Sequence, residues 1–130
     1  TFKLFLGCTS YELLCYLKPT LEQGFNTAVL HIGVNDLLKN KSPENVDELV
    51  YNLDLMAKKC KSYGVTNVLI SGIAINNRLS NTKINEANQK IANMCNEKLY
   101  TFIDNSNIGY NNVFEDGLHL EDSGKRLLIH

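Results

Sequence analysis

Continuous apolar runs alternate along the chain with stretches in which apolar residues recur every three or four positions. The continuous runs predict buried strands at residues 2–6, 27–32, 67–73 and 100–103. The periodic stretches predict helices at residues 10–17, from about 42 to 64, and from about 83 to 98. A last helix is expected to begin near Glu121. Strands that alternate with helices in this order form βαβ units, so the pattern predicts one α/β domain with a parallel sheet.

Helix boundaries are marked by a few residues. Ser42 and Pro43 offer a capping hydroxyl and a proline at the first helical position, and Gly64 offers a stop. Pro19 is expected to kink, restart or end the first helix, because proline lacks the N–H that a helix interior uses.

Length and charge narrow the class of protein. The 130 residues suffice for one domain with a core, and 44% of them are hydrophobic. Thirteen basic residues oppose fourteen acidic ones, and the net charge of −1 gives no attraction to nucleic acid or to an anionic membrane. We therefore expect no direct nucleic-acid binding by this segment. No apolar run approaches the roughly 20 residues of a transmembrane segment.

The four cysteines form no C-x-x-C pair and show no metal-ligand spacing with histidine; they are Cys8, Cys15, Cys60 and Cys95. Cys60 and Cys95 fall on apolar positions of predicted helices, where a free cysteine behaves as a small hydrophobic residue. This favours a reduced, cytoplasmic chain without metal or cofactor, although the even number leaves disulfides open.

Residues with chemical potential follow the predicted strands. Since the loops after parallel strands emerge at one edge of a sheet, these residues should meet there. Asp116 and His119 stand three apart around a glycine, so the carboxylate could orient the imidazole as a general base; a merely solvated loop is the alternative. Asn35 could donate to an oxyanion, or belong to a turn chosen for its backbone. Asp36 is expected to bond to local backbone amides.

Three segments resemble blocks of the SGNH (GDSL-like) hydrolase family. LHIGVNDLL is similar to the G-x-N-D block, FEDGLHLEDSGKRLL to the C-terminal D-x-x-H block, and LGCTSYELLCYLKPTL to the block with an oxyanion-hole glycine. Their order and separation agree across nearly the whole chain. The stretch YLKPTLEQGFNTAVLHIGVNDLL is most similar to the esterase-like domains in open reading frames of animal LINE-type retrotransposons.

This resemblance implies a three-layer α/β/α, flavodoxin-like fold and a role for each matching residue. His119 would be the base, Asp116 its partner, and Asn35 with the backbone N–H of Gly7 the oxyanion donors. The family pattern begins with a G-D-S segment after a first strand, and its serine is the nucleophile. The chain contains no G-D-S, and the similar string at 121–124 lies after the histidine, where it is expected to start the last helix. We therefore expect residues 1–130 to form a single SGNH hydrolase-like domain that is truncated at its N-terminus and at its C-terminus.

Other serines and histidines fit structural roles better. Ser71 in an apolar run is expected to bond to backbone, Ser10 to cap a helix, and Ser106 to lie in a loop. None occupies the sharp strand-to-helix turn that exposes a nucleophile. His31 is expected to be either a core histidine with its hydrogen bonds satisfied or a histidine that supports a site residue. Arg78 is expected either to contact substrate or to be solvated.

The implied strand order is 2-1-3-4-5, with the first family strand absent from this chain. That strand would lie between the first two strands seen here, so its absence leaves two unpaired edges facing a gap. We expect the isolated chain to be poorly stable, or its sheet to collapse or borrow a strand.

The leading interpretation is a serine ester hydrolase domain whose nucleophile lies upstream of Thr1 and whose substrate is a small-molecule ester. On its own the chain should be inactive. The alternative is a catalytically inactive, SGNH-like interaction or assembly domain of a retroelement protein, for which self-association is possible. A weaker alternative is a flavodoxin-like nucleotide-binding or receiver domain, but the chain lacks its glycine-rich phosphate loop and acidic cluster.

Overall fold

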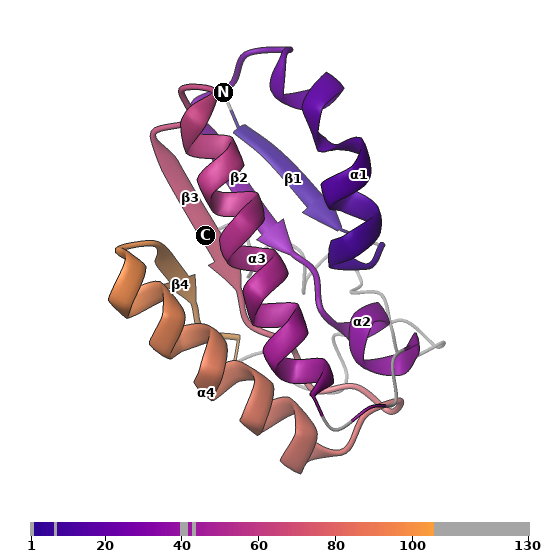
Figure 1. Ribbon diagram of the computed structural model, residues 1–130. Coiled ribbons are helices and arrows are strands. Elements are labelled where there is room, and N and C mark those ends of the chain that lie inside the picture. Colours follow the sequence, from indigo (N-terminus) through magenta and orange to yellow (C-terminus); the bar gives the residue numbers. More distant parts are fainter. Residues whose placement is uncertain (1, 7, 40–41, 43, 106–130) are drawn as a thin grey trace.

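The computed structural model describes residues 2–6, 8–39, 42 and 44–105, in which helices pack on a sheet (Figure 1). The strands of this part are β1 (Phe2–Leu6), β2 (Thr27–His31), β3 (Asn67–Ser71) and β4 (Thr101–Ile103). Its helices are α1 (Ser10–Leu21), α2 (Val34–Lys39), α3 (Asn45–Ser62) and α4 (Asn81–Lys98).

The sheet is parallel throughout, in the order β1-β2-β3-β4. Right-handed connections between successive neighbours place the connecting helices on one face. Figure 1 shows α1, α3 and α4 side by side on that face, and α3 contacts both of the others. The predicted α/β class with a parallel sheet is therefore confirmed. The described helices form a single layer, and the helix expected near Glu121 lies outside the described residues.

The expected gap beside the first strand is absent from the structure. β1 pairs directly with β2, from Phe2 opposite Thr27 to Leu6 opposite His31. Two parallel edges with no strand between them satisfy their backbone N–H and C=O groups by pairing with each other, since unpaired groups are costly. The prediction of two unpaired edges was wrong. The observed order is the one that remains when the first strand is omitted from 2-1-3-4-5.

Two helices differ from the prediction. α1 continues through Pro19 to Leu21, so the proline neither ends nor restarts it. Pro19 and Cys15 are both exposed, so water can satisfy the Cys15 carbonyl that the missing N–H leaves without a helical partner. Residues 34–39, which read as a turn in the sequence, form the short helix α2.

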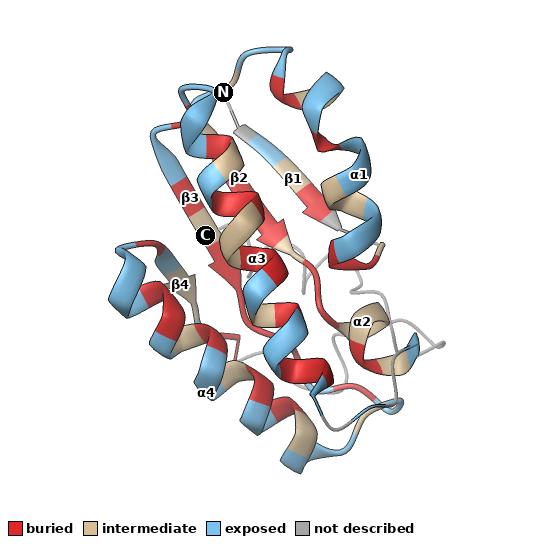
Figure 2. Ribbon diagram, viewed as in Figure 1, coloured by how far each residue is buried: buried red, intermediate tan, exposed pale blue. Residues whose placement is uncertain are grey.

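The core lies between α3 and the sheet. Figure 2 shows buried positions on the inner side of α3 and on the strands behind it. The fully buried side chains there include Leu30, Leu53, Met56 and Ile70. Truncating one of them, for example Leu53→Ala, should lower the free energy of unfolding by about 2–5 kcal/mol, since the cavity fills only partly.

The helices of the described region are amphipathic rather than apolar all round. None of them combines the length and the hydrophobicity that a bilayer crossing demands.

Candidate functional site

The carboxyl edge of the sheet collects the segments that the sequence singles out. β2 ends at His31 and leads through Gly33 into α2, and β3 ends at Ser71 and leads into Gly72. Because the strands are parallel, these segments leave the sheet at the same edge. Asn35 lies in the first turn of α2 and is half-buried.

Three of the four predicted site residues lie outside the described residues: Gly7, Asp116 and His119. Their distances from Asn35 therefore stay a prediction.

Gly33 determines how the chain passes from β2 into α2. Its φ is +154°, and a Cβ built there would lie 3.0 Å from Cδ1 of Ile73 and 3.2 Å from Cδ2 of Leu49. The Gly33 carbonyl accepts the first helical hydrogen bond, from the N–H of Leu37, at 3.1 Å. A side chain at position 33 would therefore crowd the core residues Ile73 and Leu49, at the point where the chain leaves β2 and leads to Asn35.

Asp36, the next residue after Asn35, bonds to a distant segment. Its Oδ1 accepts from the backbone N–H of Ser10 at 2.8 Å, and its Oδ2 accepts from the Ser10 hydroxyl. Ser10 Oγ in turn accepts from Nδ2 of Asn52 on α3, at 3.0 Å. The expectation that Asp36 bonds to local backbone amides holds only for its own N–H, because its main partner, Ser10, is 26 positions away and begins α1.

Burial raises the pKa of Asp36 above its ordinary value, while the hydrogen bonds from Ser10 oppose that shift. The carboxylate is thus held in a partly desolvated place by the two donors of Ser10 and by its own backbone N–H. Removing those donors would favour its protonated form.

Ser10 does not cap α1, which corrects the second expectation for this segment. Thr9 is the N-cap, and it forms a capping box with Glu12: the Thr9 hydroxyl accepts from the Glu12 N–H at 3.2 Å, and the Glu12 carboxylate accepts from the Thr9 N–H. Ser10 is 0% exposed, so its hydroxyl is inaccessible to a substrate.

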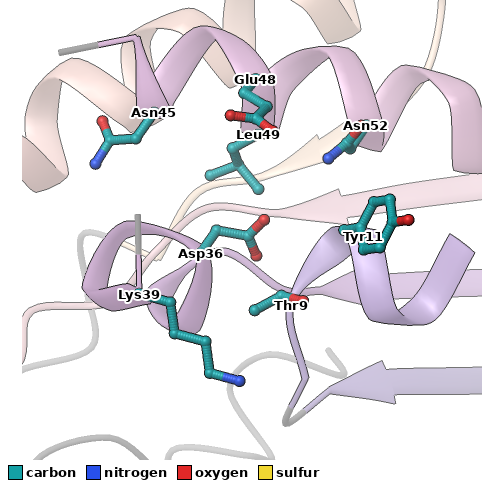
Figure 3. A pocket seen from close by; sticks show the side chains of 8 residues that line it. All are labelled: Thr9, Tyr11, Asp36, Lys39, Asn45, Glu48, Leu49 and Asn52. Atoms are coloured by element: carbon teal, nitrogen blue, oxygen red, sulfur yellow. The ribbon is translucent and has the colours of Figure 1, made fainter. Parts of the chain in front are cut away.

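A pocket of about 220 Å³ opens beside Asp36, where α1, α2 and α3 meet. Figure 3 shows the side chains that line it, which are those of Thr9, Tyr11, Asp36, Lys39, Asn45, Glu48, Leu49 and Asn52. Its lining is rich in carboxylates and amides. Asn35 does not belong to this lining, so the pocket is distinct from the proposed oxyanion position.

A second polar cluster lies at the ends of β2 and β3. Nδ1 of His31 is 2.9 Å from Oγ of Ser71, which also accepts from Nδ2 of Asn105 at 2.6 Å. The Ser71 hydroxyl can donate its one proton to the Gly72 carbonyl, 3.1 Å away, or to His31. Burial lowers the pKa of His31 from 6.5 to about 4, so the imidazole is neutral near pH 7. The prediction of a backbone-bonded Ser71 is confirmed. His31 has the expected hydrogen-bond partner at Nδ1, but it is half-buried and not a core residue.

Two asparagines hold the loop after β3, and sequence reasoning missed both. The side-chain amide of Asn88 on α4 bonds to both backbone groups of Ile73. It accepts from the N–H at 2.7 Å and donates to the carbonyl at 2.9 Å. Asn76 accepts from the N–H groups of Arg78 and Leu79 at 2.9 and 3.0 Å. Asparagine is common in solvated turns and helix faces, so no local signal distinguishes these contacts. Arg78 itself is exposed.

The described residues offer neither a metal site nor a disulfide. Nowhere among them do three or more His, Cys, Asp or Glu side chains gather in a way that could hold a metal ion. The four cysteines are free, and burial raises the pKa of Cys60 and Cys95 to about 11.

Comparison with known proteins rests on structure. No protein-family model and no curated protein sequence matches the chain. An acetylxylan esterase from Geobacillus stearothermophilus superposes with a TM-score of 0.71 at 16% identity, over 93% of this chain and 64% of the other. A GDSL-like lipase from Bacteroides thetaiotaomicron gives 0.75 at 21%, over 94% and 69%. The protein TesA gives 0.74 at 22%, over 95% and 69%.

The chain thus spans about two thirds of the length of these proteins. At such identities the likeness concerns the fold and not the activity. The chain therefore shares its parallel α/β fold with an acetylxylan esterase, a GDSL-like lipase and the protein TesA.

Proposed function

We propose that this chain is part of a serine ester hydrolase of the SGNH type that acts on small-molecule esters by acyl transfer. The observation that supports this most is the position of Asn35. It lies directly after a parallel strand and a sterically required glycine, at the edge where sites form in such sheets. The fold that the chain shares with esterases and the sequence resemblance also support the proposal.

In the proposed reaction, a serine hydroxyl attacks the ester carbonyl carbon and His119 takes its proton. The oxyanion accepts hydrogen bonds from the side-chain amide of Asn35 and from the Gly7 N–H, while Asp116 stabilises the imidazolium. Collapse of the intermediate breaks the bond to the alcohol, which leaves with the proton from His119. Water then hydrolyses the acyl-serine by the same route.

The nucleophile is proposed to come from a G-D-S segment encoded upstream of Thr1. The described serines that come nearest to the site are unsuitable, since Ser10 and Ser71 are 0% and 1% exposed and both are fully engaged in hydrogen bonds. One of the fold relatives supports a serine mechanism for this fold, because a catalytic mutant of the acetylxylan esterase replaces a serine by alanine. The LINE-type retrotransposon origin and a cytoplasmic location belong to the same proposal.

The test uses the protein extended to include its upstream coding sequence. Wild-type protein should hydrolyse p-nitrophenyl acetate, and both Asn35→Ala and His119→Ala should lower kcat by about 10²–10³-fold or more. Asp47→Asn changes an exposed carboxylate on α3 and serves as the matched control.

Hydrolysis that neither substitution changes would refute the proposal. An upstream strand that carries alanine or glycine in place of the serine would instead favour the inactive assembly domain.

A further inference from the structure

α2 is too short to be stable without contacts to the rest of the fold. It has six residues, and isolated helices of this length are not stable in water. Its orientation must therefore come from contacts with the rest of the fold. One is apolar, since the side chain of Leu37 is 2% exposed. A second is the pair of hydrogen bonds from Ser10 to the Asp36 carboxylate. A third is the exposed ion pair between Lys39 of α2 and Glu12 of α1, whose Nζ and Oε1 atoms lie 3.3 Å apart.

These two hydrogen bonds restrict Asp36 strongly. Both carboxylate oxygens are used, one by the N–H and one by the hydroxyl of the same residue, so the carboxylate can neither rotate nor slide without losing a bond. Ser10 is itself held in place by packing and bonding, because it is fully buried in the first turn of α1 and accepts from Asn52 on α3. The first turn of α2 is thereby held against α1 and α3 together (Figure 3).

Asn35 immediately precedes Asp36 in that first turn. A rotation of α2 about its axis would move the Asn35 side chain relative to the carboxyl edge of the sheet. An oxyanion donor acts only within hydrogen-bond distance of the developing charge, so a displacement of about 1 Å is enough to weaken catalysis.

We propose that Asp36 is a positioning residue for Asn35, and that its bonds to Ser10 hold the Asn35 amide in the direction that oxyanion binding requires. This inference rests on the proposed function, because its readout is ester hydrolysis. It does not depend on the position of Gly7.

The experiment is a double-mutant cycle in the upstream-extended protein with p-nitrophenyl acetate. Asp36→Ala should lower kcat by about 10–100-fold, with KM changed by less than about threefold. In an Asn35→Ala background the same substitution should lower kcat by less than about twofold, because the group that Asp36 positions is gone. Asp36→Asn keeps an acceptor for the Ser10 N–H and should recover part of the loss, and Ser10→Ala should show an intermediate loss.

A purely structural role predicts a different pattern. Asp36→Ala would then lower the thermal midpoint but leave kcat per folded molecule unchanged, or it would lower kcat equally in both backgrounds. Either result overturns the inference while the hydrolase proposal stands. If Asp36→Ala fails to fold, Asp36→Asn and Ser10→Ala are put through the same cycle.

Failure of the proposed function has its own signature. In that case wild-type protein does not hydrolyse the ester, or Asn35→Ala and His119→Ala leave the rate unchanged, and the inference about Asp36 falls with it.

Discussion

Acidification should weaken the fold through His31, which is half-buried at the end of β2. Burial lowers the pKa of this imidazole from 6.5 to about 4 in the folded protein. Between these two values the unfolded chain binds a proton that the folded chain does not. The contribution of neutral His31 to the free energy of unfolding is therefore complete above about pH 6.5, and it is lost progressively as the pH falls towards 4.

The size of the effect follows from the two pKa values. Each unit of difference corresponds to about 1.4 kcal/mol, so the full shift corresponds to about 3 kcal/mol. Through proton binding at His31, the free energy of unfolding should fall by about 2 kcal/mol between about pH 7 and pH 5. That is a large part of the 5–15 kcal/mol by which domains are typically stable.

The assay compares wild-type protein with His31→Asn across this pH range. Asparagine places a polar atom near the position of Nδ1, so it can keep the hydrogen bond to Ser71 without titrating. Urea unfolding should show that wild type loses about 2 kcal/mol more than the variant on acidification. Carboxylates contribute equally to both proteins and cancel in this difference.

Two results would refute this reasoning. One is an NMR titration in which the His31 imidazole protonates near pH 6.5 in the folded protein. The other is an identical pH dependence of stability in wild type and His31→Asn.

The remaining predictions concern single contacts. Gly33→Ala should lower the free energy of unfolding, measured by urea denaturation, by about 2–4 kcal/mol. The cause is that the alanine Cβ would crowd the core at a backbone φ that side chains rarely adopt. A loss under about 0.5 kcal/mol would contradict this crowding. Tyr100→Phe should cost about 1–3 kcal/mol by the same measurement, because the hydroxyl donates to the carboxylate of Asp54 at 2.8 Å. The thiol of Cys60 is buried, and burial raises its pKa to about 11. Ellman's reagent should therefore label exposed Cys15 in native protein and Cys60 only after unfolding. Rapid labelling of Cys60 in native protein would contradict its burial.

The regular elements could be predicted because their signals are local. The apolar run from Ala28 to Leu30 predicts a strand buried on both faces, and β2 is such a strand. The spacing of Leu49, Leu53 and Met56 predicts the inner face of α3, where all three are buried.

Elements that depend on distant contacts were missed. The letters Gly-Val-Asn-Asp favour a turn, yet residues 34–39 form a helix held by the burial of Leu37 and by bonds to Ser10. The direct pairing of β1 with β2 was missed for a related reason. Strand order came from the family pattern, whereas this chain satisfies its backbone groups with the strands that it contains.

In the candidate site, too, features with a local sequence signal could be predicted, and features that depend on distant contacts could not. The place of Asn35 after β2 could be predicted, because strand ends in a parallel sheet share an edge. The bond between Asp36 and Ser10 could not, since it depends on how α1 lies against α2. His31 is intermediate: a polar residue in an apolar run indicates a buried partner, but only the fold identifies it as Ser71.

Asn35 is proposed to donate a hydrogen bond to the oxyanion of an ester hydrolase. A crystal structure of the upstream-extended protein, inactivated with a phosphonate ester that mimics the tetrahedral intermediate, tests it directly. We expect a phosphonate oxygen about 2.7–3.1 Å from Nδ2 of Asn35, with the phosphorus bonded to a serine beside His119. A phosphonate bound away from the edge where β2 meets α2, with Asn35 turned from it, would contradict the account.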